Sequence, residues 1–84
     1  MYKKYKIVFL DPTGDTAWRN KEELKNFYPE HCVIEGYIFS KDKKFIKTFA
    51  SYSVDENLNI TAFGDCNVLP TNCVIKIIKL KESK

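Results

Sequence analysis

The sequence is short of the residues that most metal sites and duplex-binding surfaces need. Its 84 residues include one histidine, one arginine and three cysteines without regular spacing. Zinc sites usually show two close pairs of ligands, and duplex-binding proteins usually carry dense basic patches rich in arginine. We therefore expect no metal and no binding to duplex DNA. No apolar run has the length of a signal-peptide core or a membrane span, which predicts no membrane association and a reduced, cytoplasmic setting.

The chain also lacks the residue groupings of a catalytic site. His31 and Cys32 are adjacent, and adjacent strand residues point to opposite faces, so the imidazole is not placed to activate the thiol. Asp11 and Asp15 share one loop, but the further oxygen ligands of a calcium loop are missing, and aspartate is common in turns. We therefore expect no enzymatic activity and no cofactor.

Aromatic residues are abundant, with six Phe, five Tyr and one Trp. The length fits one small domain, residues 1–84, in which large rings bury much area. The net charge of +3 comes from lysines spread along the chain, most of which we expect to be solvated. The aromatic positions outnumber what one small core needs, which predicts exposed rings and self-association into a homo-oligomer. These positions are Tyr37, Phe39, Phe45, Phe49 and Phe63.

Hydrophobic patterning and turn residues predict five strands and one short helix. Asn20 is the expected N-cap, Glu23 stands in the capping-box position, and Pro29 ends the helix. Gly36, in the second strand, indicates a bend or a close backbone approach. A tight turn at residues 70–73 precedes the last strand. The strands are expected at residues 5–10, 32–39, 44–52, 58–63 and 74–80. Residues 64–67 break the fourth of them, and a short apolar step before Pro70 is expected to be a strand end.

This order of elements predicts a mainly β fold. We expect a small five-stranded antiparallel barrel of the Sm-like type, with the short helix inserted after the first strand. Closing the sheet would hide its edges, which otherwise invite pairing with other chains. The alternative is an open α+β sheet with the helix on one face.

Several segments together resemble small accessory proteins encoded by tailed phages and prophages. The resemblance implies a small β-barrel protein made in the cytoplasm of a bacterial host cell, and it implies no catalytic residues. Phage proteins of this size often act in counter-defence, by blocking a host factor or sequestering a nucleotide immune signal. The matching residues are Asp11-Pro12, Trp18, Leu24, Glu35-Gly36-Tyr37 and the closing segment with Pro70, Val74 and Ile77.

Five residues are candidates for a ligand-binding site: Trp18, Arg19, Tyr37, Lys44 and Lys47. An exposed indole at position 18 would offer a stacking face to a base, and Arg19 would add a cation near a helix N-terminus. The lysines would meet phosphates. For Trp18 and Arg19 we favour the alternative, in which the indole closes the end of the barrel and the guanidinium is solvated.

The leading functional hypothesis is a non-enzymatic counter-defence protein that sequesters a small anionic nucleotide at a subunit interface. The first alternative is a protein–protein interaction module that inhibits a host factor through an exposed face or edge strand. The second alternative is binding of RNA or single strands, which the shortage of arginine disfavours.

Overall fold

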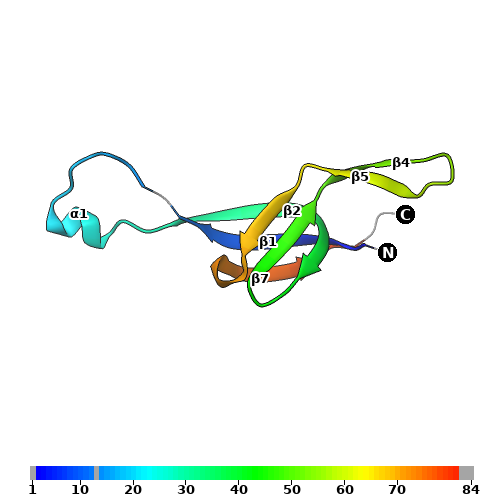
Figure 1. Ribbon diagram of the computed structural model, residues 1–84. Helices are drawn as coiled ribbons and strands as arrows, with labels where there is room; N and C mark the ends of the chain where they lie inside the picture. Colours follow the sequence, from blue (N-terminus) through cyan, green and yellow to red (C-terminus); the bar gives the residue numbers. More distant parts are fainter. Residues whose placement is uncertain (1, 13, 82–84) are drawn as a thin grey trace.

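The computed structural model describes residues 2–12 and 14–81 of the chain. The described part is mainly β, and its strand pairings are antiparallel. This confirms the prediction of a mainly β, antiparallel fold. The elements follow one another in the order β1 (Lys4–Asp11), α1 (Lys21–Lys25), β2 (Glu30–Lys41), β3 (Phe45–Phe49), β4 (Ser51–Val54), β5 (Ile60–Gly64), β6 (Asn67–Pro70), the 3-10 turn η1 (Thr71–Cys73) and β7 (Val74–Lys79) (Figure 1).

Five of the strands form one sheet in the order β6-β3-β2-β1-β7, and β4 pairs with β5 in a separate hairpin. The edge strands β6 and β7 are joined by η1, which forms at the predicted tight turn. They are not hydrogen-bonded to each other in the described part of the chain, so the sheet is not closed there.

One of the predicted strands, residues 44–52, is interrupted, and the expectation of a continuous strand there is wrong. The break is at Ala50, where the chain bends and the backbone N–H donates to the Gly64 carbonyl at 3.2 Å. The predicted break after residue 63 is present and lies at Asp65, whose φ of 52° lies in the left-handed region. Leu58, expected at the start of a strand, lies in a turn with a φ of 66°. The β4–β5 hairpin therefore leaves the main sheet and projects beyond it (Figure 1).

The helix begins as predicted but ends early. The Asn20 side-chain oxygen accepts from the Glu23 backbone N–H at 2.8 Å, and the Glu23 carboxylate accepts from the Asn20 N–H at 3.0 Å. After Lys25 the chain leaves the helix at Asn26, so Phe27 and Tyr28 lie beyond it, contrary to the prediction. No residue of α1 is buried. Short helices depend on tertiary packing, and without it the helical pattern is not continued.

The core on one face of the sheet follows from the strand register. Residues opposite each other on paired strands share a face. Ile7 of β1 lies opposite Ile34 of β2 and Ile77 of β7, and Ile46 of β3 lies opposite Leu69 of β6. Ile7 and Ile46 are fully buried, and Leu69 is 8% exposed. These side chains form one small aliphatic core.

A second apolar centre consists of six aromatic residues, which we call the aromatic cluster. Phe49 lies at its middle and is only 2% exposed. Its ring centroid lies 4.7 Å from that of Phe63 and 5.2 Å from that of Tyr37. Because strand residues alternate, Phe49 lies on the opposite face of β3 from Ile46. Much of the aromatic excess in the sequence is therefore accounted for by a second core. The cluster comprises Tyr2, Tyr37, Phe39, Phe49, Tyr52 and Phe63.

The molecule is elongated. Its principal extents are 60 × 26 × 24 Å and its radius of gyration is 17.0 Å, whereas a compact chain of this length has a radius of about 12 Å. Helix α1 lies at one end and the β4–β5 hairpin at the other (Figure 1). No helix among the described residues has the length and apolar character needed to cross a membrane.

Candidate ligand-binding hollow

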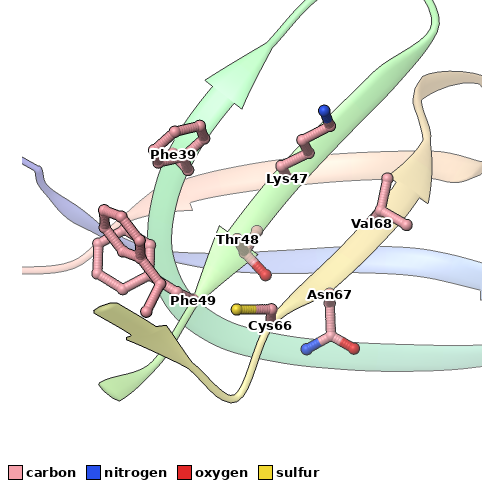
Figure 2. Close-up of a pocket in the computed structure, with 8 residues that line it drawn as sticks. Phe39, Lys47, Thr48, Phe49, Cys66, Asn67 and Val68 are labelled. Atoms are coloured by element: carbon pink, nitrogen blue, oxygen red, sulfur yellow. The ribbon is translucent and has the colours of Figure 1, made fainter. Parts of the chain in front are cut away.

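A hollow with a volume of about 330 Å³ lies where the main sheet meets the β4–β5 hairpin. We call it the aromatic hollow. Side chains of β2, β3, β5 and β6 line it together with Cys66, which follows the break at Asp65 (Figure 2). The lining therefore depends on the same chain break that separates the hairpin from the sheet. The lining residues are Phe39, Lys47, Thr48, Phe49, Phe63, Cys66, Asn67 and Val68.

Two rings of the hollow remain half-exposed. Phe39 is 48% exposed and Phe63 is 40% exposed, and their centroids lie 5.2 Å apart in an edge-to-face arrangement. Phe49 supports Phe63 from within the protein. Rings held from behind in this way keep a flat apolar surface open to a ligand, and such surfaces stack on nucleobases.

Lys47 supplies a cation at the hollow. It lies on β3, where it pairs in register with Val68 of β6 (Figure 2). Among the described residues the one ion pair within 4.0 Å joins Arg19 to Asp15, so the Lys47 ammonium forms no salt bridge there. Its charge helps to lower the pKa of Asp42, and its nitrogen points away from Phe39 and Phe49 (Figure 2).

Asn67 and Thr48 lie opposite each other in the β3–β6 pairing and complete the polar part of the lining. Asn67 is exposed, and Thr48 is 3% exposed. A side-chain amide provides both hydrogen-bond donors and an acceptor, which suits the edge of a heterocyclic base. The hollow thus combines flat apolar walls, a cation and an amide.

Tyr37 and Lys44, unlike Lys47, do not line the hollow. Tyr37 belongs to the aromatic cluster and stacks on Phe49. Lys44 lies in the turn between β2 and β3, where its backbone N–H donates to the Asp42 carboxylate at 2.8 Å. The backbone N–H groups of Phe45 and Lys44 lower the pKa of Asp42, and the Phe45 N–H has the larger effect. Of the predicted site residues, Lys47 therefore lines the hollow and Tyr37 belongs to the aromatic cluster. The hollow and the cluster share Phe49.

Trp18 and Arg19 directly precede Asn20, the N-cap of α1. This helix lies at the opposite end of the molecule from the β4–β5 hairpin (Figure 1). Trp18 is 99% exposed, so the favoured interpretation that it closes a barrel end is wrong. Arg19 is an exposed residue, as expected. It forms a salt bridge with Asp15, and its guanidinium carbon lies 4.1 Å from the centre of the Phe27 ring. These contacts hold the loop before α1 and leave the indole without cover.

The sequence analysis missed the residues after β5 that complete the hollow. A signal for Cys66 and Asn67 was present, because the polar break at residues 64–67 separates two apolar stretches. The pattern gave no reason to place that break beside Phe39, which is 25 or more residues earlier in the chain. Their proximity depends on the pairing of β3 with both β2 and β6.

The three thiols are free. Partial burial raises the pKa of the Cys32 thiol, and the carboxylates of Asp11 and Glu30 raise it further. Since the thiolate is the nucleophilic form, this environment makes Cys32 less reactive at neutral pH. The described residues contain no group of three or more His, Cys, Asp or Glu side chains placed to hold a metal ion.

Comparison with known proteins gives no relative on which to base a function. No family model matches the chain, and searches of curated proteins and of solved structures found no match.

Proposed function

We propose that this chain is a non-enzymatic binding protein that holds a small anionic nucleotide in the aromatic hollow. The observation that carries the proposal is that Lys47 lines the same hollow as the half-exposed rings of Phe39 and Phe63. Hollows of about 300 Å³ or more are the usual size for small-molecule sites. Sequestering a nucleotide immune signal in phage counter-defence is the setting that the resemblance to phage accessory proteins implies.

In this proposal the base stacks on Phe39 or Phe63, which supplies about 1–3 kcal/mol per base. A phosphate oxygen accepts a hydrogen bond from Lys47 Nζ, a charged contact that contributes about 1.5–3 kcal/mol. The Asn67 amide pairs with the edge of the base. None of these groups has to transfer a proton or form a covalent bond, so the site retains its ligand unchanged.

Isothermal titration calorimetry against a panel of mono- and cyclic dinucleotides tests the proposal. Lys47→Met should weaken the best ligand at least about tenfold and reduce the salt dependence of binding. Lys43→Met is the matched control, because it removes the same charge from the β2–β3 turn, outside the hollow. Absence of binding by any nucleotide, or equal losses in the two variants, would reject the site.

We also propose that the described sheet represents a small Sm-like barrel. Three features support this. β2 pairs with β1 through residues 30–37 and with β3 through residues 37–41, as a strand bending around a barrel does. Gly36 lies at the change of partner, where an added Cβ would stand 2.9 Å from the Phe49 carbonyl oxygen. The edge strands β6 and β7 are also joined by a single turn. Amide hydrogen exchange tests closure, which predicts slow exchange along both edges; fast exchange there indicates an open sheet.

A host protein bound through an exposed face is the second candidate function. The β4–β5 hairpin favours it, because Tyr52 is 49% exposed and Leu58, in the connecting turn, is 79% exposed. Affinity capture from host extract should then give one stoichiometric partner with the natural chain and none with Leu58→Ser. Equal capture by both proteins would exclude the hairpin as the contact.

A further inference from the structure

The described residues between β1 and β2, residue 12 and residues 14–29, form an arm that has no core of its own. It connects β1 to β2 and carries α1, in which no residue is buried. Trp18 is 99%, Tyr28 71% and Leu24 61% exposed on this arm. Its ordered contacts are local, such as the capping box and the Arg19–Asp15 salt bridge. A five-residue helix with exposed apolar side chains needs a surface to pack against.

The exposed area of the whole chain shows how large that surface can be. The accessible area is 7106 Å², whereas a compact chain of this mass exposes about 5,200 Å². The excess is therefore about 1,900 Å² per chain. A standard protein–protein interface buries about 800 Å² on each partner. The excess is sufficient for a stable dimer in which each chain covers the other at two places.

The charges distinguish between two ways of pairing two copies. Residues 12–29, between the two strands, contain three carboxylates and three cations and have no net charge, while the rest of the chain contains eight carboxylates and eleven cations, a net charge of +3. Two bodies packed on each other bring like charges together. The neutral arm packed on the body of a second copy avoids this repulsion.

We propose that two copies associate side by side in opposite directions, so that each arm lies across the aromatic hollow of the other copy. The arm lies at one end of a 60 Å molecule. The hollow lies where the main sheet meets the β4–β5 hairpin, and that hairpin lies at the other end (Figure 1). A two-fold axis through such a pair makes both arm–hollow contacts at once and leaves no unpaired arm, as a closed dimer requires. The occupant of the hollow's open side is Trp18 of the second copy.

This arrangement gives the ligand site a second wall. Trp18 is a large aromatic side chain, the type that most often dominates an interface. In the dimer its indole faces Phe39 and Phe63, and a base between them stacks on both sides. This role of Trp18 rests on the proposed function, whereas the association itself does not require a nucleotide.

The association is tested by sedimentation velocity over a range of protein concentrations, without ligand. Trp18 is the one tryptophan of the chain, so its emission should shift to shorter wavelength and its quenching by acrylamide should fall as dimer forms. Trp18→Ser should weaken the dimer at least about 30-fold. Ile75→Ser is the control, because Ile75 is a 51% exposed apolar residue on β7, away from the arm and the hollow. It should stay within about threefold of the natural chain.

A mixing experiment identifies the partner surface of Trp18. Val68→Asp places a carboxylate in the hollow at a residue that is 58% exposed, so folding is retained, which far-UV circular dichroism checks. Each variant alone should be monomeric. A mixture of Trp18→Ser with Val68→Asp should form a heterodimer, because the intact arm of one meets the intact hollow of the other. A normal dimer of Val68→Asp alone would show that the hollow is not the contact, and a mixture without heterodimer would show that an intact arm and an intact hollow do not associate; both overturn the inference.

Calorimetry with the same variants separates this inference from the proposed function. A dimer with the expected mixing behaviour that binds no nucleotide supports the association and rejects the function. A natural chain that stays monomeric, yet binds a nucleotide with unchanged affinity after Trp18→Ser, supports the function and rejects the inference.

Discussion

The strongest test of the fold is the replacement of Phe49 by leucine. Phe49 is 2% exposed and its ring meets four other rings of the aromatic cluster at centroid distances of 4.7 to 6.1 Å. Leucine removes these edge and stacking contacts and leaves part of the ring volume empty. We expect the free energy of unfolding to fall by about 1–3 kcal/mol. With a urea dependence of about 1 kcal/mol per molar for a small domain, the midpoint falls by roughly 1–3 M.

Phe45→Leu on the same strand is the matched control. Phe45 is 45% exposed and lies outside the aromatic cluster, so its replacement should change the free energy of unfolding by no more than about 0.5 kcal/mol. Urea titrations followed by circular dichroism, at a protein concentration where the chain is monomeric, measure both. Equal losses in the two variants would show that Phe49 is not the centre of a second core, and the assignment of two apolar centres would have to be withdrawn.

Three further predictions concern the backbone, the acid range and the arm. Gly36→Ala should lower the free energy of unfolding by about 1–3 kcal/mol, because the added methyl meets the Phe49 carbonyl; an unchanged urea midpoint would contradict this. Backbone N–H donors lower the pKa values of Asp42 and Asp55 in the folded protein. Both carboxylates therefore stabilise the fold above about pH 4, the ordinary pKa of aspartate. This stabilisation is lost as the pH falls through the folded pKa values. Replacing both by asparagine should therefore lower the melting temperature at pH 7 and make little difference near pH 2. Asn20→Ala should speed amide exchange in α1 while leaving global stability unchanged, since no residue of that helix is buried.

Signals confined to neighbouring residues predicted the structure well. The capping box at Asn20 and Glu23 needs only a polar acceptor and a carboxylate three residues apart, and both hydrogen bonds form. The turn after Pro70 is likewise formed where the sequence placed it. The close approach expected at Gly36 is present because the Phe49 backbone crosses there. These features depend on chemistry within a few residues, or on the missing side chain of a glycine.

Features that depend on distant partners could not be predicted in the same way. The hydrophobic alternation through Ala50 continues across the bend, because alternation reports which face a residue occupies and not whether the strand keeps its partner. The hollow needs Phe39 and Asn67 brought together through β3, a pairing that no local pattern encodes. Trp18 was expected inside because large rings are usually covered, and the described chain has nothing that covers it.

The separation of α1 from both apolar centres has a consequence for how the sequence can vary. Substitutions and length changes between the ends of β1 and β2 remove no buried side chain of the helix, so they cost the fold little. Natural variants should therefore diverge fastest between those two strands, with Ile7, Ile46 and Phe49 held nearly constant. If the arm contributes to binding as proposed, the binding specificity can change under selection faster than the buried residues can.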